Sequence, residues 1–485
     1  MAQNSDPKFV VAISRRGADR IRAGHVWVYR SDVVEAQGIE PGALVLVQEQ
    51  ASGGPQARSH KPALSGVEGN VRAARPASRQ GAARPRPPHA LGSALYSTSS
   101  EIAIRMISSK PVTDIGQLVR ERVRAAIAYR ERFVKDTNAY RLIFSEGDFL
   151  PGLIVDRYND ILSLQVLTQA MDSDPMRNAF VSELQDALKP AAIFERVDPR
   201  VRKLEQLPEK ESGIVGGAGN SQSEGSSRSN DAHVGAGVLT RPAALVAAMP
   251  DEHSSPARTG VSGPTHLSVE SQNRVTTEFH MNGVRFLYDA LAGQKTGAFL
   301  DQRENYAAGA QYARGEALDA FCYQGGFALH LARACEKVTG VDSSRPALEA
   351  AEQNAGLNGC EIEWIEANAF DLLRDYSDAG RKFDTIVLDP PAFAKSRQNR
   401  ETALRGYKEL NLRALKMLRP GGVLVSCSCS YHVSAADLLE VLASAAQDSH
   451  RILRILENRG AAKDHPSVLG VPETAYLKCV LATVS

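Results

Sequence analysis

Two motifs near the C-terminal end of the chain place reactive side chains directly after apolar runs that are typical of strands. Asp389-Pro-Pro follows the run 383–388, and Cys427-Ser-Cys429 follows the run 421–426. A cysteine thiolate is a nucleophile that can activate a substrate by covalent addition. A lone cysteine is more often a small buried hydrophobic residue, but two cysteines beside an acidic strand end favour catalysis. Because side chains alternate along a strand, Cys427 and Cys429 point to the same face, and periodicity does not choose between them.

A second set of residues follows three earlier strands and predicts a site for an adenosine-containing cofactor. Asp319 ends the first strand and precedes the pair Gly325-Gly326, Asp342 ends the second strand, and Asn368 follows the third. In an open α/β sheet, ligands bind beyond the carboxyl ends of the strands, where an acid can accept both ribose hydroxyls. A helix cap is the alternative for both Asp342 and Asn368; position favours the ribose role for Asp342. Adjacent glycines lack the three-glycine spacing of a pyrophosphate-binding turn.

The elements that must hold these residues form three blocks. After about residue 310, strands and helices alternate, which predicts a parallel sheet covered on both faces, and Asn282-Gly283 predicts a hairpin before it. Short alternating runs within 8–50 and 91–108 predict a small N-terminal β domain. The middle block is expected to contain a helix at 114–135 and strands at 153–158, 161–167 and 193–194.

The predicted helix at 114–135 is rich in basic residues that are either a solvated face or a surface that contacts phosphates. The solvated face is the more common case. These residues are Arg120, Arg122, Arg124, Arg130, Arg132 and Lys135.

Two stretches without any Phe, Tyr or Trp interrupt the blocks. Residues 51–90 are rich in Arg, Pro and Ala, and residues 213–272 are rich in Gly and Ser. Neither can bury enough apolar surface to offset the entropy of ordering it, so both are interpreted as flexible insertions. A basic RNA-binding arm is the alternative for 51–90.

The overall composition excludes several classes of protein. The 485 residues carry 57 Lys and Arg against 56 Asp and Glu, so a wholly basic protein is excluded, although local patches can still bind nucleic acid. No apolar run approaches the length of a membrane span, and the N-terminus does not resemble a signal peptide. The six cysteines lack paired CxxC spacing and the histidines lack ligand spacing, so no metal is expected. A soluble cytoplasmic protein is predicted.

The ordered set of motifs resembles the class I S-adenosylmethionine-dependent methyltransferases. More narrowly, it is similar to bacterial large-subunit ribosomal RNA cytosine-C5 methyltransferases built on a PUA domain, over about four-fifths of the chain. The similarity rests on Asp319-x-Phe-x-Tyr-x-Gly-Gly-Phe, Val341-Asp342-Ser, Leu388-Asp389-Pro-Pro-Ala-Phe, Gly293-Gln-Lys-Thr-Gly-Ala-Phe-Leu-Asp-Gln-Arg303, Glu146-Gly-Asp-Phe-Leu-Pro-Gly-Leu-Ile-Val-Asp-Arg157 and Asp464-His-Pro-Ser-Val-Leu-Gly.

This resemblance implies an α/β fold class: a Rossmann-like methyltransferase domain preceded by a PUA-like β-barrel and a small α+β domain. The expected boundaries are 1–108 for the PUA-like domain, with an insert at about 51–90, 109–212 for the central domain, 213–272 for the second insert and 273–485 for the methyltransferase domain. S-adenosyl-L-methionine is the implied cofactor. The residues expected to bind it are Asp319, Gly325, Gly326, Asp342, Asn368, Gln302 and Arg303, and the segment from Gly297 to Arg303 should line the pocket for the cofactor or target base.

The resemblance also implies large-subunit ribosomal RNA as the partner and 5-methylcytosine as the product, with a homodimer left open. Cytosine C5 needs activation, and a thiolate that adds to C6 supplies it. The family pattern Ser-Cys-Ser followed by an acid fits Cys429 with Asp437, so Cys429 is expected to be the nucleophile, while Asp389 holds the cytosine edge. Asn368 would hydrogen-bond the adenine edge; the family commonly has Asp at this position, and Asn keeps an acceptor oxygen while its amide nitrogen cannot accept.

Two other functions remain open. Asp-Pro-Pro-x-Phe also resembles the sites of methyltransferases that modify an exocyclic amine and need no cysteine, and Phe393 would either stack on a base or pack in the core. A non-catalytic RNA-binding or ribosome-assembly factor is the second alternative. The retention of Gly325, Asp342, Asp389 and Cys429 in one chain argues against it.

Overall fold

The computed structural model describes residues 9–50, 90–218, 275–291, 297–394 and 397–485. Almost all of the two stretches interpreted as flexible insertions lies outside the described residues. The second insert was predicted to begin at 213, which is too early, because Gly213–Gly216 forms strand β11. This strand pairs with β10 (Ala192–Glu195) at the edge of a sheet, so backbone pairing orders a segment whose composition alone did not predict a strand.

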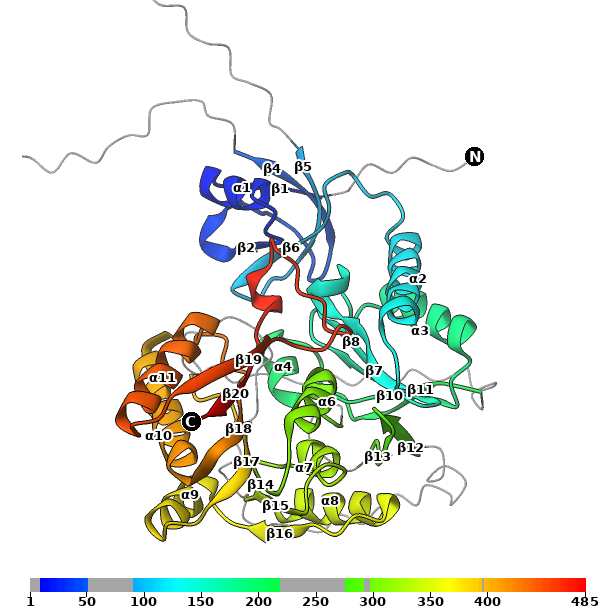
Figure 1. Cartoon of the computed structure of the whole chain (residues 1–485). Helices are drawn as coiled ribbons and strands as arrows, with labels where there is room; N and C mark the ends of the chain where they lie inside the picture. Colours follow the sequence, from blue (N-terminus) through cyan, green and yellow to red (C-terminus); the bar gives the residue numbers. More distant parts are fainter. Residues whose placement is uncertain (1–8, 51–89, 219–274, 292–296, 395–396) are drawn as a thin grey trace, which may run out of the picture.

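The N-terminal domain is a six-stranded sheet in the order β2-β6-β5-β4-β1-β3 (blue in Figure 1). Its core consists of apolar side chains that alternate along these strands, such as Val11, Val45 and Ile104, each fully enclosed. Its elements are β1 (Phe9–Ile13), α1 (Arg15–Arg22), β2 (Trp27–Tyr29), β3 (Val33–Glu35), β4 (Leu44–Glu49), β5 (Ala90–Tyr96) and β6 (Ile102–Ser108). The predicted small β domain is confirmed.

The central domain is a five-stranded sheet in the order β11-β10-β9-β8-β7, and its core joins the sheet to two helices. The strands that precede β10 are β7 (Ala139–Phe144), β8 (Leu153–Tyr158) and β9 (Ile161–Val166), and the helices are α2 (Ile115–Phe133), α3 (Asp174–Leu188) and the short α4 (Pro199–Leu204). Asp114 begins α2 as its cap by accepting a hydrogen bond from the Gln117 amide.

Contacts with other parts of the chain engage three of the basic residues that the sequence places in the 114–135 segment. Arg124 pairs with Glu183 of α3 at 2.6 Å. Arg130 is enclosed and pairs with Asp148, and Arg122 donates to the carbonyls of Ile107 and Phe149. These three arginines form contacts within the central domain and with its neighbours, which leaves a smaller basic surface than the sequence suggested.

The C-terminal domain is a seven-stranded sheet in the order β16-β15-β14-β17-β18-β20-β19, with the first five strands parallel and β20 and β19 antiparallel. One buried cluster joins one face to α6, α7 and α8, and another joins the opposite face to α9, α10 and α11. The predicted cover on both faces is confirmed, whereas the sheet is parallel only in its first five strands and not throughout as predicted. Its strands are β14 (Glu316–Ala320), β15 (Lys337–Asp342), β16 (Glu363–Glu366), β17 (Phe383–Leu388), β18 (Leu418–Ser428), β19 (Leu453–Arg459) and β20 (Lys478–Val484). Its helices are α6 (Arg303–Tyr312), α7 (Gly326–Leu331), α8 (Arg345–Asn358), α9 (Ala369–Asp378), α10 (Arg400–Met417) and α11 (Ala435–Asp448).

The predicted hairpin precedes this sheet. It pairs β12 (Thr276–Met281) with β13 (Val284–Asp289) through a turn in which Asn282 has φ 52° and Gly283 has φ 78°. Such left-handed positions favour Asn and Gly, which explains why the dipeptide marks the turn.

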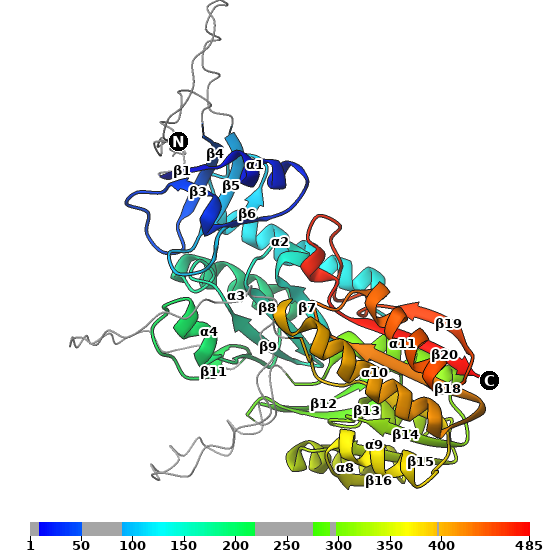
Figure 2. The same ribbon diagram turned by 90° about the vertical axis from the view of Figure 1, so that its left-hand side faces the viewer.

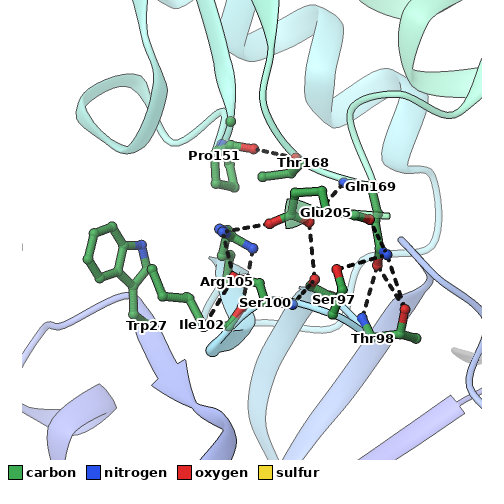
Figure 3. A network of polar contacts seen from close by, with 12 residues as sticks. Trp27, Ser97, Thr98, Ser100, Ile102, Arg105, Pro151, Thr168, Gln169 and Glu205 are labelled. Atoms are coloured by element: carbon green, nitrogen blue, oxygen red, sulfur yellow. Dashed lines mark hydrogen bonds and ion pairs between the residues drawn. The ribbon is translucent and has the colours of Figure 1, made fainter. Parts of the chain in front are cut away.

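The three domains are joined by polar contacts as well as by the chain. Arg105 of β6 is enclosed between the N-terminal and central domains, and its guanidinium lies 3.5 Å from Glu205, which follows α4. Glu205 also accepts from the Ser97 hydroxyl, and Gln169 donates to the Glu205 carbonyl (Figure 3). This buried network fixes the N-terminal domain on the central one.

The segment between β19 and β20 leaves the C-terminal sheet and reaches the other two domains (red in Figures 1 and 2). The Glu473 carboxylate lies 3.4 Å from the His25 imidazole of the N-terminal domain. The Asp464 carboxylate accepts from the Arg141 amide of the central domain at 2.7 Å. Through this segment the C-terminal domain, which carries the candidate catalytic residues, contacts both other domains.

Candidate active site

A pocket opens at the carboxyl ends of the parallel strands, where the strand order reverses between β14 and β17. This is the position where open α/β sheets bind ligands. Of the residues predicted from sequence, it is lined by Asp319, Asp342, Gly326, Gln302, Asp389 and Cys429. The structure therefore brings together strand ends that lie far apart in the sequence.

Asp319 lies at the base of the pocket, at the end of β14, and is 1% exposed. Its Oδ2 accepts from the Ala328 amide at 2.8 Å, whereas its Oδ1 has no hydrogen-bond partner within the described residues. Burial raises the pKa of Asp319 well above its ordinary value, and the neighbouring carboxylates of Asp389 and Asp342 add to the effect. A cationic ligand would relieve this unfavourable arrangement.

Asp342 faces the pocket from the end of β15, where two backbone amides hold its carboxylate. The amides of Tyr323 and Ser344 each donate to it at 2.9 Å. Burial raises the pKa of Asp342, and these two hydrogen bonds act against that rise. The N-cap of α8 is Ser344, so Asp342 does not cap this helix, and its carboxylate is instead held at the pocket by the turn before the helix.

The turn between β14 and α7 approaches the pocket closely. Gly325 has φ 82°, a left-handed conformation that favours glycine, and it caps α7. A Cβ on Gly326 would lie 2.5 Å from the Tyr306 ring, so no larger residue fits there without moving that ring. The pair therefore meets a close packing requirement instead of forming a phosphate cradle.

Gln302 and Arg303 are adjacent in sequence but differ in environment. Gln302 lines the pocket, and its amide donates to Asp389 Oδ1 at 2.9 Å. Arg303 begins α6 and is 1% exposed, with its guanidinium 3.1 Å from the Asp464 carboxylate. Arg303 is not among the residues that line the pocket, because the start of the helix directs its side chain towards the β19–β20 segment. The predicted direct contact with the cofactor gains no support from this placement.

Asn368 is also placed away from the pocket lining. Its side chain is exposed and accepts from the Phe370 amide at 2.9 Å, which caps α9. Of the two interpretations left open by the sequence, this geometry is the helix cap.

Asp389 and the two prolines after it form one wall of the pocket. Phe393, a few residues on, does not line it; its ring packs 4.6 Å from Tyr407 and 5.5 Å from Phe370 between ring centroids. The packing alternative for Phe393 is the one that the structure shows.

The two candidate cysteines differ in exposure. Cys427 is fully enclosed and lies opposite Cys479 of β20, and burial followed by this neighbour raises the pKa of its thiol well above the ordinary value. Cys429 lies just beyond the end of β18, lines the pocket, and its Sγ is 3.9 Å from the Pro390 carbonyl oxygen. Only the second thiol is therefore placed where a substrate could meet it.

The segment from Gly297 to Arg303, which the resemblance placed at the pocket, lines it through Ala298, Phe299, Asp301 and Gln302. Phe299 and Tyr323 form an edge-to-face pair with centroids 4.9 Å apart, and both line the pocket. Asp301 lines it too and accepts a 2.6 Å hydrogen bond from the Tyr476 hydroxyl. Phe299 and Asp301 lie in a motif used for the family resemblance, which was the available signal. Tyr476 had none, because it reaches the site only through the β19–β20 segment.

Comparison with known proteins decides the family. Residues 261–481 match the S-adenosylmethionine-dependent methyltransferase family and residues 11–58 match the PUA-like domain family. The chain is 33% identical over 392 residues to ribosomal RNA large subunit methyltransferase I of Photobacterium profundum, which spans 79% of this chain and 84% of that protein. It is 35% identical over 398 residues to the protein of the same name from Erwinia tasmaniensis, covering 80% and 86%. The chain belongs to the ribosomal RNA large subunit methyltransferase I family.

Solved structures agree with this family at the level of the fold. A SAM-dependent methyltransferase of Streptococcus mutans superposes with a TM-score of 0.66 at 14% identity, covering 98% of this chain and all of that one. A methyltransferase crystallised with SAH gives a TM-score of 0.67, also at 14% identity and with the same coverage. The fold therefore extends over all three domains, including the PUA-like domain at the N-terminus.

As a member of this family the chain is an S-adenosylmethionine-dependent methyltransferase, and the pocket fits that cofactor. Within the described residues, the unpartnered Asp319 Oδ1 offers a buried acceptor to a cationic ligand, and Asp342 and Gly326 line the same cavity. The cofactor supplies an electrophilic methyl group on a sulfonium. Among the described residues, no helix is long and apolar enough to cross a membrane, and no cluster of His, Cys, Asp or Glu could hold a metal ion.

Proposed function

We propose that this methyltransferase forms 5-methylcytosine in large-subunit ribosomal RNA and that Cys429 is its nucleophile. One observation carries the proposal: the Cys429 thiol lines the same pocket as Asp389 and the cofactor-facing acids Asp319 and Asp342. The RNA substrate is supported by the names of the relatives, which are ribosomal RNA large subunit methyltransferases. The PUA-like match at the N-terminus supports contact with RNA outside the pocket.

The proposed chemistry uses Cys429 to make a poor nucleophile reactive. The thiolate bonds to C6 of cytosine and shifts the electron pair of the C5–C6 double bond to C5. C5 then takes the methyl group, and S-adenosylhomocysteine is the leaving group. A base removes the proton from C5, the bond between C6 and sulfur breaks, and the Cys429 thiolate is restored.

Asp389 is proposed to hold the cytosine ring by accepting from its exocyclic amine. Gln302 donates to Asp389 Oδ1, which fixes the carboxylate beside Pro390 and Cys429. A base taken from RNA must be recognised by its hydrogen-bonding edge, and a fixed carboxylate suits that task. Asp319, Gly326 and Asp342 are proposed to bind the cofactor. Arg303 and Asn368 are proposed to stabilise the segments around the pocket, through the ion pair with Asp464 and the cap of α9.

Methylation of an exocyclic amine is the rival reaction, because it uses the same Asp-Pro-Pro-x-Phe motif. It requires no thiol, so a pocket-facing Cys429 beside the motif favours the C5 reaction. RNA containing 5-fluorocytidine separates the two, because fluorine at C5 cannot leave as a proton. We expect the wild-type protein to form a stable RNA adduct that survives denaturing gels, whereas amine methylation would leave no adduct.

The cysteine assignment has a matched pair of variants. Cys429→Ala should form no adduct and lose methyl transfer while it still binds S-adenosylmethionine, as measured by isothermal titration. Cys427→Ala removes a buried thiol and should retain the adduct, with a loss of about 1 kcal/mol in stability. An active Cys429→Ala together with an inactive Cys427→Ala would reverse the assignment.

We further infer three domains, at 1–108, from 109 to the end of β11 at Gly216, and at 273–485, and a cytoplasmic location, where ribosomal RNA is accessible. A homodimer remains a hypothesis, which light scattering of the full chain would test.

A further inference from the structure

A buried lysine lies beside the strand end that carries Cys429. Lys478 begins β20 and is 7% exposed. Its ammonium donates to the carbonyl oxygens of Ser430 at 2.6 Å and Tyr476 at 2.7 Å. Within the described residues, no carboxylate lies within ion-pair distance of it. An ammonium enclosed in this way without a carboxylate is unusual, because burying a charge costs much free energy unless the charge is paired and hydrogen-bonded.

The position of Lys478 ties it to the candidate nucleophile. Ser430 directly follows Cys429, so the Lys478–Ser430 hydrogen bond holds the backbone next to the thiol. The charges of Lys478 and Cys429 act on each other, and Asp437 favours the ammonium further. Burial lowers the pKa of Lys478 to about 8, so it remains largely charged at neutral pH.

Among the described residues, the neighbouring groups Tyr407, Tyr476 and Asp389 carry no positive charge. Tyr407 and Tyr476 are near enough to sense a thiolate, and burial raises the pKa of both phenols, which keeps them neutral. Asp389 lines the same pocket and is acidic. These neighbours leave Lys478 as a group whose charge can favour the thiolate over the thiol.

We propose that Lys478 is a positioning residue that keeps Cys429 in its thiolate form and holds it at the mouth of the pocket. This inference rests on the proposed function, since it concerns the nucleophile of that reaction. A thiolate is the reactive form of cysteine, and a nearby cation increases its population at neutral pH. A purely structural role, in which the ammonium only joins two carbonyls, predicts no effect on the ionisation of Cys429.

Alkylation of Cys429 by iodoacetamide measures this effect without RNA or cofactor. The rate is followed by mass spectrometry of the peptide that contains Cys429, from pH 5.5 to pH 10, in the full chain. Lys478→Met should shift the midpoint of the rate profile upwards by about one pH unit, which lowers the rate at pH 7 about 10-fold. Lys478→Arg keeps the charge and should restore most of the rate.

Lys382→Met is the matched control, because the Lys382 ammonium also donates to a backbone carbonyl, that of Lys416 at 2.7 Å, but lies at the opposite end of the sheet. Its profile should match that of the wild type. A profile for Lys478→Met that also matches the wild type would overturn the proposal. If Lys478→Met does not fold, the wild-type profile decides: its midpoint must lie below the ordinary thiol value of about 8.5.

The alkylation result is independent of the proposed reaction. A Cys429 profile that depends on Lys478, combined with no adduct on 5-fluorocytidine RNA, would reject the cytosine-C5 chemistry and retain the inference about Lys478. If the adduct forms normally but the Cys429 alkylation profile is the same in wild type and Lys478→Met, the cytosine-C5 chemistry is retained and the inference about Lys478 is rejected.

Discussion

Replacing Asp319 by Asn tests whether the buried acid at the base of the pocket binds the cofactor through its charge. Asn is nearly isosteric and keeps an oxygen that can accept from the Ala328 amide, which bonds Oδ2 at 2.8 Å in the wild type. What is lost is the negative charge behind Oδ1, the atom that has no partner among the described residues. The change therefore removes the ligand-binding capacity and leaves the packing intact.

The expected loss of affinity follows from one charge-assisted hydrogen bond. Such a bond contributes about 1.5–3 kcal/mol, which weakens S-adenosylmethionine binding by about 10- to 100-fold. At a cofactor concentration 100 times the wild-type Kd, binding adds about 2.7 kcal/mol to the stability of the wild type. A variant that binds 100-fold more weakly keeps only about 0.4 kcal/mol of this gain. The weaker affinity measured by isothermal titration should therefore be matched by a smaller cofactor-induced rise in melting temperature.

Without cofactor the same variant should be more stable than the wild type at pH 8. The folded-state pKa of Asp319 lies above its ordinary value of 3.8, so the folded chain retains a proton that the unfolded chain releases. The stability of the wild type therefore falls as pH rises above 3.8, and the Asp319→Asn variant would not carry this penalty. At pH 4 the two proteins should differ little.

Asp371→Asn is a suitable control, because this exposed carboxylate on α9 pairs only with Arg374 among the described residues. It should leave both affinity and stability unchanged. Binding by Asp319→Asn within threefold of the wild type would refute the assigned role of Asp319. A lower apo stability of Asp319→Asn at pH 8 would refute the inference that the acid is held against its preferred ionisation.

Two further predictions concern the contacts between domains. Arg105→Met should lower the free energy of unfolding by about 3–5 kcal/mol in urea titrations, because it leaves the enclosed Glu205 carboxylate without its cation; a change below about 1 kcal/mol would contradict the network as a stabilising element. Asp464→Asn should destabilise the protein at pH 7, because His465 and Arg303 hold the pKa of Asp464 below its ordinary value. The depressed pKa of Asp464 stabilises the folded wild type above pH 3.8, and this stabilisation is lost as the pH falls. The difference in stability between variant and wild type should therefore shrink below pH 4. A difference that grows below pH 4 would contradict this role of Asp464.

Much of the fold could be predicted because its signals are local. The alternation of strands and helices after residue 310 and the Asn282-Gly283 turn depend on the residues themselves, and both are confirmed. The meeting of the polar residues at the strand ends could be predicted from the topology, because parallel strands end at the same edge of their sheet. Asp319 and Asp342 therefore meet in one pocket although separate strands carry them.

Predictions about side-chain direction were weaker, because a helix start reorients neighbouring residues. Gln302 and Arg303 share a motif, yet the first turns towards Asp389 and the second towards Asp464 as α6 begins. Asn368 could either cap a helix or reach a ligand, and only the course of the chain at α9 separates the two. Residue type and spacing carry no information on such turns.

The choice between the two cysteines shows how a distant segment determines local chemistry. Cys427 and Cys429 are equivalent by strand alternation, but the pairing of β18 with β20 ends at Ser428 opposite Lys478. Cys427 lies within this pairing and is buried opposite Cys479, whereas Cys429 lies beyond the last paired residue and lines the pocket. The residue that ends the pairing is also the buried lysine, 48 positions after Ser430, whose carbonyl it binds. The same long-range contact thus exposes one thiol, buries the other and brings a positive charge to the exposed one.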